Sequence, residues 1–487
     1  MPLPPLTSTS PLDWRYTAEG GANLVLSFAG PSDSPYTGRA LRLRKCKRRT
    51  AVDERPHENE VPAHVDVEFG RRVIEPLLGH AQVVDTEKVP LDKRWLQGVV
   101  DGLREEGARP AEREKEDEID LDAAEGVVAE DLVGGKGVLA IEIKPKWGFL
   151  PSPTFLSPST RDIKTSFCRF CMHRYHKRTP SASDCAATAA SLAEHEAGFC
   201  PLDLYSGDAE RLKCAVEALY QGWTASSGEA NNLRIFLGGE RLSPPDGTTE
   251  SSVQLGHLVL TLQHLGLSLS PPIPPQPPCH TASPAFPVSS LLADVLVPAL
   301  LASPLLATLS RLQATLDALD VEGLGALISR ETGGAVDLPS ASADDLAVLG
   351  GQPSLEEWTA WLERYLPLLQ PPPPPPSSTL TAPDSRQVML DALASSPTTL
   401  RDSTLAYLLS ATFKDCSLIV RFPPPSPDFS SAASSVDVSV KAIDLDPKPI
   451  IRLGKYARMD SAIVEGWKAL LEGLSVEERG KVRRCRV

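Results

Sequence analysis

The stretch VLAIEIKPKWGFLP, residues 138–151, joins an apolar run to two closely spaced lysines. Its first part, Val138 to Lys144, predicts a buried strand that ends in a charged tip. Pro145 restricts the backbone to an extended geometry, so the ammonium groups of Lys144 and Lys146 point in fixed directions. This arrangement suits a ligand that carries several phosphate groups. The alternative is an ordinary solvated strand end.

Elements on both sides of this stretch predict an α+β fold. We expect a hairpin of two strands at 23–29 and 39–45, because apolar alternation is interrupted there by a turn rich in Gly, Pro and Ser. Further strands are predicted at 233–237, 417–422 and 436–443, and helices at 62–78, 208–223 and 461–474. The acidic run at 112–125 is typical of a solvated loop.

The composition limits the classes of function. The chain has 487 residues and a net charge of −14, which argues against nucleic-acid binding. No apolar run is long enough to suggest a membrane span, and no signal peptide is evident. Its nine cysteines follow no disulfide-like pattern. We therefore expect a reducing compartment, the nucleus or the cytoplasm.

Proline is concentrated in a few stretches of the 46-proline chain. Residues 268–287 and 370–380 combine prolines with serines and few large apolar side chains, so we expect Pro-rich disordered insertions there. The six consecutive prolines also resemble ligands of SH3 or WW domains. Residues 291–319, rich in Leu and Ala, predict helices.

Three further motifs could carry chemistry. Gly20 and Gly21 lead directly into a strand, where backbone N–H groups can approach a phosphate, although many hairpins begin in this way. Asp415 and Asp444 each lie at a strand end beside a basic residue, as in kinases, although either could be part of an ordinary turn.

The segment RFCMHRYHK, residues 169–177, has two interpretations. Cys168, Cys171, His173 and His176 could bind zinc, which would indicate a zinc-dependent nucleic-acid binder. The short separation of Cys171 from His173 favours instead a basic segment that contacts phosphate.

The motifs taken together resemble the inositol-pentakisphosphate 2-kinase family in a fungal form. The resemblance rests on WRYTAEGGANLVLSF, EIKPKWGFLP, RFCMHRYHK, LDLYSGD, NNLRIFLGG, KDCSLIVRF and VKAIDLDPKP, which occur in this order. It covers residues 12–240 and 400–460, and no match is found between about 245 and 400. It implies a two-lobed kinase-like fold with a nucleotide-binding N-lobe at 12–150 and a C-lobe at 151–487 that binds inositol phosphate, with insertions at 245–400.

The resemblance also implies a set of site residues and two small ligands, ATP and Mg²⁺. The family's nucleotide-binding residues match Gly20, Gly21, Ala22, Asn23, Arg42 and Glu142. Its inositol phosphate ligands match Arg113, Lys144, Lys146, Arg169, Lys177, Asn232, Lys448, Arg452 and Tyr456. Its catalytic aspartate matches Asp415, and its magnesium ligand matches Asp444. The implied reaction is phosphorylation of the 2-hydroxyl of inositol pentakisphosphate, and the alternative is a catalytically weak inositol-phosphate-binding module.

The sequence departs from the family pattern in two places. Plant members have a Cys/His zinc site, but the corresponding region here offers only Cys279, His257, His264 and His280, so that site is not expected. The Asp-His pair that often precedes the EIKPK strand is replaced by Glu130-Asp131-Leu132.

Overall fold

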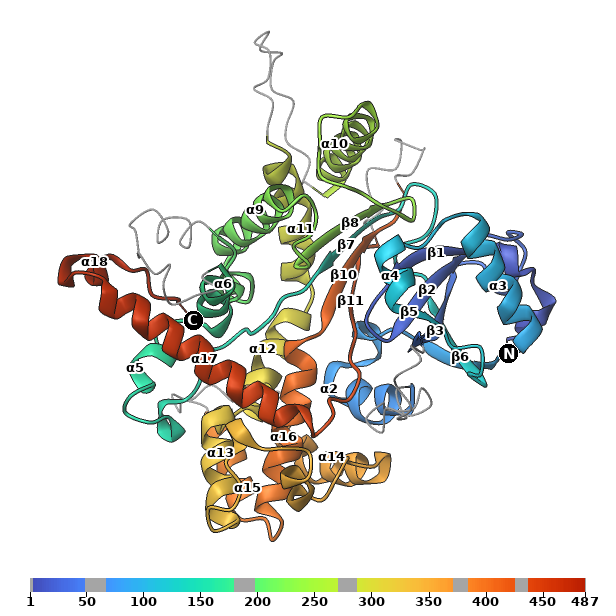
Figure 1. The fold of residues 1–487 in the computed structure, drawn as a ribbon. Helices are drawn as coiled ribbons and strands as arrows, with labels where there is room; N and C mark the ends of the chain where they lie inside the picture. Colours follow the sequence, from blue (N-terminus) through green and yellow to red (C-terminus); the bar gives the residue numbers. More distant parts are fainter. Residues whose placement is uncertain are drawn as a thin grey trace, which may run out of the picture. The chain divides into compact units, whose positions relative to one another are not determined.

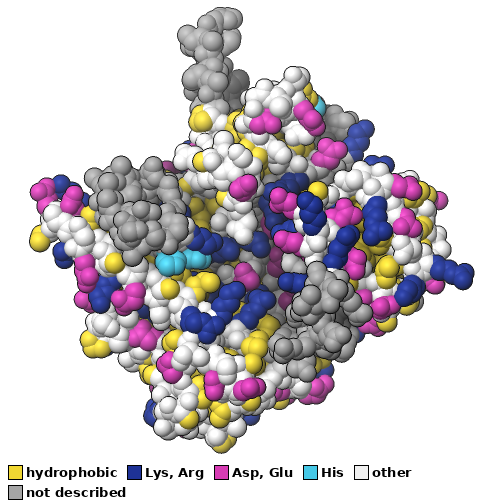
Figure 2. All heavy atoms as spheres, viewed as in Figure 1, with side chains coloured by type: hydrophobic (Ala, Val, Ile, Leu, Met, Phe, Trp, Pro, Cys, Tyr) yellow, Lys and Arg dark blue, Asp and Glu magenta, His cyan; other side chains and the backbone are white. Residues whose placement is uncertain are grey.

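The computed structural model describes residues 3–48, 67–178, 198–269, 287–370, 384–424 and 437–486 (Figure 1). The chain divides into two compact units. The first comprises residues 1–141, 234–243 and 419–441, and the second comprises 142–233, 244–418 and 442–487. Helices and two sheets are both present, which confirms the predicted α+β class. Charges of both signs are spread over the surface (Figure 2).

The first sheet has six strands in the order β1-β2-β3-β6-β4, with β5 also paired to β3. Their bounds are β1 Trp14–Glu19, β2 Asn23–Phe28, β3 Arg39–Lys47, β4 Thr86–Pro90, β5 Asp117–Ile119 and β6 Glu125–Glu130. Strands β2 and β3 pair antiparallel, which confirms the predicted hairpin. Strand β1, which was not predicted, adds to its edge.

Helix α3 (Lys93–Glu105) covers the apolar side of this sheet. Alternate residues of β2 and β3, including Leu24, Leu26 and Leu41, are fully buried and pack with Trp95 of the helix. Asp92 begins the helix, because its carboxylate accepts hydrogen bonds from the backbone N–H groups of the first turn. The hydrophobic core of the first unit therefore lies between α3 and the hairpin.

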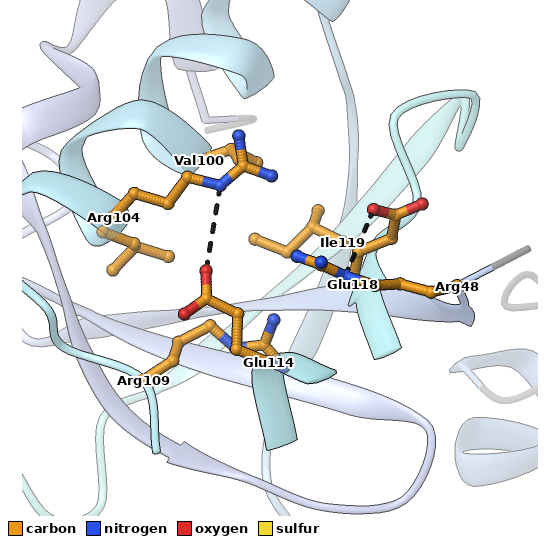
Figure 3. A pocket seen from close by; sticks show the side chains of 8 residues that line it. Arg48, Val100, Arg104, Arg109, Glu114, Glu118 and Ile119 are labelled. Atoms are coloured by element: carbon orange, nitrogen blue, oxygen red, sulfur yellow. Dashed lines mark ion pairs between the residues drawn. The ribbon is translucent and has the colours of Figure 1, made fainter. Parts of the chain in front are cut away.

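The prediction of a solvated loop at 112–125 is wrong. Residues Ala111–Glu116 form helix α4, and β5 follows immediately. Glu114 lies 3.8 Å from Arg104, and Glu118 lies 3.8 Å from Arg48 (Figure 3). Asp117 is buried, with its carboxylate 2.9 Å from Lys45 Nζ and 2.7 Å from Arg109. The acidic run forms ordered structure because Lys45 and Arg48, which are distant in sequence, pair with it together with the nearer Arg104 and Arg109.

The second sheet has five strands in the order β11-β10-β7-β8-β9. Their bounds are β7 Leu139–Ile143, β8 Leu233–Leu237, β9 Glu240–Arg241, β10 Ser417–Phe422 and β11 Ser439–Ile443. The predicted strands at 138–144, 233–237 and 417–422 are confirmed. All five residues of β7 are buried, which is the reason for its continuous apolar sequence.

Helices make up most of the second unit. They are α5 Arg161–Lys164, α6 Arg169–Arg178, α8 Pro201–Leu204, α9 Ala209–Ala225, α10 Thr249–Leu269, α11 Val288–Ala302, α12 Leu305–Leu316, α13 Asp320–Glu331, α14 Leu355–Leu369, α15 Ser385–Ala394, α16 Thr399–Lys414, α17 Arg452–Gly473 and α18 Val476–Lys481. Helix α12 packs on α16, and α6 packs on α17 (Figure 1). The predicted final helix is confirmed, but it begins earlier, at Arg452.

Residues 245–400 include helices α10 to α15. The helices predicted at 291–319 are confirmed as α11 and α12. Most of the predicted Pro-rich insertions, including the six consecutive prolines, lies outside the described residues. Among the described helices, none alone meets the length and hydropathy expected of a membrane span, although α11 and the following segment to Glu331 do so as a bent pair.

Replacement of Asp117 by Ala tests the buried ion pairs of the first unit. The change leaves Lys45 and Arg109 buried with Glu19 as their remaining carboxylate. We expect the free energy of unfolding to fall by about 3–5 kcal/mol, measured by urea denaturation. The exposed Glu112 in the same acidic run serves as the control, and its replacement by Ala should change stability by less than about 0.5 kcal/mol. Equal effects of the two substitutions would show that the ion pairs of Asp117 do not stabilise this unit.

Candidate active site

The segment after β7 has an unusual backbone conformation. Lys146 adopts a left-handed conformation with φ of 63°, which residues other than glycine rarely occupy. Its carbonyl oxygen accepts hydrogen bonds from Gln313 Nε2 at 3.0 Å and from the Tyr205 hydroxyl at 3.3 Å. Two residues on, a Cβ at Gly148 would lie 2.6 Å from the Tyr205 ring, so only glycine fits there. These contacts fix the direction of the Lys146 side chain.

Gln313 connects this segment to the end of helix α16. It lies on α12 and is completely buried. Its Oε1 accepts from the Gly148 N–H at 2.8 Å, and its Nε2 also donates to the carbonyl oxygen of Phe413 at 2.9 Å. Phe413 precedes Asp415 by two residues. One amide side chain therefore positions the turn of Lys146 and the backbone that carries Asp415.

Lys144 is positioned through its backbone by Asn232. The Lys144 N–H donates to the Asn232 carbonyl at 3.0 Å, and Asn232 Nδ2 donates to the Lys144 carbonyl at 3.1 Å. The ammonium group of Lys144 lies 3.8 Å from Asp444 Oδ2. Asn232 therefore holds the backbone of Lys144 in place.

Asp415 and Asp444 are both in the second unit, and each has a lysine beside its carboxylate. Asp415 caps the C-terminus of α16, and its carboxylate is 3.0 Å from Lys448 Nζ. Asp444 follows β11 in a left-handed conformation with φ of 60°. The Ser417 hydroxyl lies 3.0 Å from Glu142 Oε1 and 3.4 Å from Asp444 Oδ2. Glu142 is thus buried beside Ser417, close to Asp444.

The charges around Asp415 are mainly positive. Partial desolvation raises the pKa of Asp415, but Lys448, Lys146 and Lys144 more than offset it and hold the pKa below its usual value. The pKa of Lys146 is lowered because it is buried and because Lys144 and Lys177 repel its charge, although Asp415 opposes this. The site therefore contains an ionised aspartate among lysines that are incompletely neutralised by protein groups.

Helix α6 adds further basic side chains. Arg169, His173 and Lys177 are spaced four residues apart, so they share one face of the helix. The guanidinium of Arg169 lies 2.9 Å from Asp460 and 4.8 Å from the centre of the Trp147 ring. Burial and nearby cations, Lys177 and Arg169 foremost, lower the pKa of His173 to about 4. Figure 2 shows cyan histidine side chains with dark blue Lys and Arg side chains close to them.

The first turns of α17 carry Arg452 and Tyr456. Burial raises the pKa of Tyr456, while the positive charges of Lys448 and Arg452 oppose that rise. The negative charge of Asp415 also contributes to raising the pKa of Tyr456. Because α17 begins earlier than predicted, both residues are on a helix rather than in a loop.

Buried ion pairs lie next to the candidate site residues. Lys414 Nζ lies 2.6 Å from Asp317 and 4.2 Å from the centre of the Trp147 ring. Lys164 lies 2.5 Å from Asp320 and 2.8 Å from Asp460. No local pattern in the sequence indicates a role for Gln313, Asp317 or Asp320, because their partners lie far away in the chain.

The predicted nucleotide-binding residues of the first unit lie around the β1–β2 turn. The Gly20 N–H donates to the Asn23 carbonyl at 2.9 Å, and added Cβ atoms at Gly20 and Gly21 would meet open space. With the Asn23 amide oxygen turned towards Arg42, the Arg42 guanidinium donates to it at 3.1 Å. Arg113 lies on α4.

The proposed zinc ligands Cys168, Cys171, His173 and His176 do not form one cluster. Cys168 and Cys171 lie with Cys200 and Cys485, whereas His173 is among the cations of α6. Of the residues in the plant-type region, His257 and His264 lie on α10, and Cys279 and His280 are outside the described residues.

Comparison with known proteins gives a consistent result. The family model for inositol-pentakisphosphate 2-kinase matches residues 16–462, and so includes the region 245–400. An inositol-pentakisphosphate 2-kinase of Cryptococcus neoformans is 31% identical over 480 residues, which cover 96% of this chain and 95% of the relative. The Arabidopsis thaliana protein of that name is 27% identical, with 93% and 92% covered. This chain therefore belongs to the inositol-pentakisphosphate 2-kinase family.

Proposed function

We propose that this protein transfers the γ-phosphoryl group of ATP to the 2-hydroxyl of inositol 1,3,4,5,6-pentakisphosphate and so forms inositol hexakisphosphate. The observation that carries the proposal is the exposed carboxylate of Asp415 among Lys144, Lys146 and Lys448. A substrate with five phosphates needs many cations, and a hydroxyl acceptor needs a nearby base. Both are present in one unit of a chain whose family has this activity in its name.

Asp415 acts on the acceptor hydroxyl. Because Lys448, Lys146 and Lys144 hold its pKa below the usual range, it is ionised at neutral pH and can accept a hydrogen bond from the hydroxyl. Phosphoryl transfer passes through a loose transition state with little demand for a strong base. Asp415 therefore orients the hydroxyl by accepting its hydrogen bond, and the Asp415 carboxylate takes up the proton as the new O–P bond forms.

The lysines and arginines bind the phosphates of the substrate. Lys144 and Lys146 have fixed backbones, so binding needs to order only their side chains. Arg169 is held by Asp460 on one side and packs against Trp147 on the other. We assign Lys177, Arg452 and Tyr456 to the same role, with Arg113 as a phosphate ligand from the first unit. Asn232 contributes by holding Lys144.

The donor set fits Mg²⁺. Asp444 is exposed beside Ser417, and carboxylate oxygens are the protein ligands that Mg²⁺ uses together with ATP phosphates. When bound, Mg²⁺ neutralises charge on the transferring phosphoryl group. We assign the ATP phosphates to residues 20–23 and Arg42, and we place Glu142 at the nucleotide end of the site.

The proposal extends to architecture and location. We propose that residues 12–150 act as the N-lobe and 151–487 as the C-lobe of a two-lobed kinase-like fold. Such a kinase would work in the nucleus or cytoplasm. An SH3 or WW partner for the six prolines remains a separate prediction.

The reaction is tested with purified full-length protein, ATP and Mg²⁺. Each inositol phosphate isomer is supplied in turn, and the products are separated by ion-exchange chromatography. We expect inositol hexakisphosphate from the pentakisphosphate, with one ADP formed for each product. Tight binding of the pentakisphosphate without product would support the alternative, a catalytically weak binding module.

Replacement of Asp415 by Asn tests the assignment of the base. We expect kcat to fall by about 10²–10⁴-fold, because the amide cannot take up the proton. Binding of the pentakisphosphate, measured by calorimetry, should persist, since a negative charge is removed from a site for a polyanion. The exposed Asp391 on α15 provides the control, and Asp391→Asn should behave as wild type. A kcat near the wild-type value in Asp415→Asn would remove Asp415 from the mechanism.

Replacement of Lys144 or Lys146 by Ala tests the phosphate contacts. Each change should weaken substrate binding by about 1.5–3 kcal/mol, or roughly 10- to 160-fold in Kd. The dependence of Kd on salt concentration should also become weaker. The exposed Lys93 on α3 is the matched control. If neither substitution changes Kd, Lys144 and Lys146 do not bind the substrate phosphates, and the end of β7 is an ordinary solvated strand end.

Replacement of Gln313 by Leu tests whether its hydrogen bonds to Lys146 and Phe413 position the substrate lysine and Asp415. Loss of its hydrogen bonds frees the carbonyls of Lys146 and Phe413, so both substrate KM and kcat should change. We expect KM to rise and kcat to fall by about tenfold each, since small displacements of reacting groups are costly. The exposed Gln387 on α15 is the control. A variant with lower thermal stability but wild-type kcat and KM would show that Gln313 is only structural.

A further inference from the structure

A buried lysine, Lys164, lies between two carboxylates of the second unit. Its Nζ is 2.5 Å from Asp320 Oδ1 and 2.8 Å from Asp460 Oδ2. The three side chains are between 3% and 8% exposed. Lys164 ends α5, Asp320 begins α13 and Asp460 lies on α17. Three helices that are distant in the sequence therefore meet at one buried ammonium group.

The carboxylate of Asp460 is shared between two cations. Oδ2 accepts from Lys164 Nζ at 2.8 Å, and Oδ1 accepts from Arg169 Nε at 2.9 Å. Burial raises the pKa of Asp460, but the charges of Lys164 and Arg169 more than offset this effect and hold the pKa below its usual value. Asp460 is therefore ionised, and each of its oxygens is bound to a different cation.

Asp460 uses only the Nε of Arg169. Within the part of the chain that the structure describes, the two terminal nitrogens of this guanidinium have no hydrogen-bond or ion-pair partner. The guanidinium lies 4.8 Å from the centre of the Trp147 ring, and Trp147 follows the candidate substrate ligand Lys146. The terminal nitrogens can therefore bind one phosphate as a pair, which is the geometry that arginine favours with phosphates.

The single hydrogen bond between Asp460 and Arg169 needs an explanation. Arginine and a carboxylate frequently pair through two parallel hydrogen bonds. Such a pair would use both oxygens of Asp460 and would also take up a terminal nitrogen of Arg169. Here Lys164 occupies Oδ2, so Asp460 offers only Oδ1 to the arginine. Lys164 thereby keeps both terminal nitrogens of Arg169 available.

Asp320 fixes Lys164 in turn. Its backbone is left-handed with φ of 62°, a conformation that Asp adopts more readily than most residues. Its Oδ1 also accepts from the Glu322 N–H at 2.9 Å, which ties the carboxylate to the first turn of α13. Burial raises the pKa of Asp320 to about 7 although Lys164 opposes the rise, so the charge of Lys164 is balanced mainly by Asp460.

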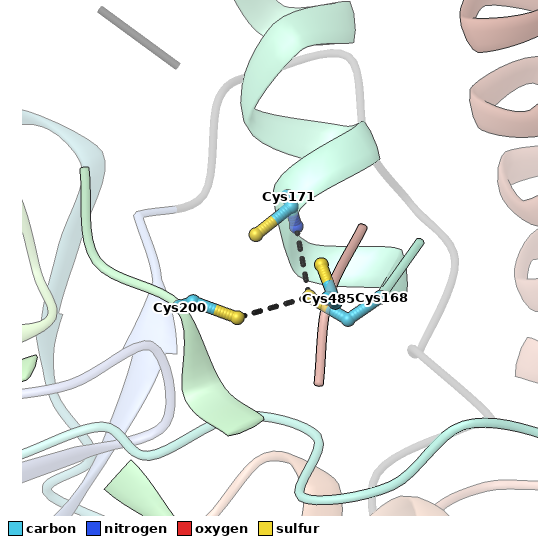
Figure 4. A group of neighbouring side chains, drawn as sticks. All are labelled: Cys168, Cys171, Cys200 and Cys485. Carbon is cyan, nitrogen blue, oxygen red and sulfur yellow. Dashed lines mark hydrogen bonds between the residues drawn. The ribbon is translucent and has the colours of Figure 1, made fainter. Parts of the chain in front are cut away.

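The backbone of Arg169 is held separately from its side chain. Arg169 begins α6, and the side chains of Cys168, Cys171, Cys200 and Cys485 lie together at this end of the helix (Figure 4). Cys168 and Cys171 are buried. The ion pairs therefore need to position only the side chain of Arg169.

We propose that Lys164 is a positioning residue for substrate recognition: by occupying one oxygen of Asp460, it leaves the terminal nitrogens of Arg169 to bind a single phosphate of the inositol phosphate. The inference rests on the proposed kinase function and adds a determinant of substrate choice to it. A substrate that lacks this phosphate leaves the guanidinium unpaired and binds more weakly. Lys164 itself touches no substrate and acts only through Asp460.

The first test is Lys164→Met in full-length protein. We expect the Kd of the pentakisphosphate, measured by calorimetry without ATP, to rise about tenfold. KM should rise in parallel while kcat stays within about twofold, because the contact with the phosphate is equally strong in the ground state and the transition state. Asp320, with its raised pKa, can take up a proton, so the variant contains no unpaired buried charge. The control Lys468→Met removes a partly exposed lysine of α17 and should keep the wild-type Kd.

A double-mutant cycle shows whether Lys164 acts through Arg169. Arg169→Ala alone should raise Kd about tenfold. Addition of Lys164→Met to it should cost less than about twofold more, because the side chain that Lys164 positions is already absent. Asp460→Asn, which keeps the size of the side chain, gives a second cycle with the same expectation. Additive losses in Kd would show that Lys164 is only structural and would overturn the inference.

Inositol tetrakisphosphates that each lack a different phosphate provide a second readout. In wild-type protein each should bind more weakly than the pentakisphosphate. In Arg169→Ala and in Lys164→Met this penalty should disappear for one and the same isomer, and the penalties of the other isomers should persist. Loss of the penalty for different isomers in the two variants, or for none, would overturn the inference.

These binding measurements separate the inference from the proposed reaction. Protein that shows both couplings in Kd but forms no hexakisphosphate would contradict the reaction and support the role of Lys164. Protein that forms the hexakisphosphate and shows additive losses would contradict only the role of Lys164. Wild-type protein that does not bind the pentakisphosphate would overturn both.

Discussion

The hydrogen bonds of one buried amide, that of Gln313, hold together the geometry of the candidate active site. Lys146 occupies a left-handed backbone conformation that is unfavourable for a lysine and persists only where neighbours hold it. Gln313 supplies that restraint through the carbonyl of Lys146 and the N–H of Gly148. Through Phe413 the same amide also restrains the turn of Asp415. The backbone positions of Asp415, the candidate base, and of Lys146, a candidate substrate ligand, therefore both depend on Gln313.

The second constraint is electrostatic. An overall charge of −14 repels a polyanion at long range, but salt screens that repulsion beyond about 10 Å. Close to Asp415 the charges of three lysines dominate, and they shift its pKa downwards despite its partial desolvation. A bound polyphosphate would relieve the mutual repulsion of Lys144, Lys146 and Lys177. Local placement of cations, rather than net charge, therefore determines what this site can bind.

Buried ion pairs connect the candidate site residues to the surrounding helices. Lys414, next to Asp415, contacts Asp317 and the face of Trp147, and Arg169 is held by Asp460 on α17. Removing either partner of such a pair leaves an uncompensated buried charge. Gln313 and Asp317 lie in the region where the sequence shows no family motif. They nevertheless support residues of the motifs, namely Lys146 and Lys414. This region lies within the part of the chain that the family model spans.

The sequence by itself determined the local elements, the class of fold and the family. Strands β7, β8 and β10 and helix α9 were predictable because their periodicity reports burial on one or both faces. Motif order identified Asp415, Asp444, Lys144 and Lys146 as candidates. Only the tertiary structure decided what holds them. The order of residues 111–119, the role of Gln313 and the meeting of Cys485 with the start of α6 all depend on partners far away in the chain. Local patterns carry no information on such partners, because the contacts form only when distant segments pack together.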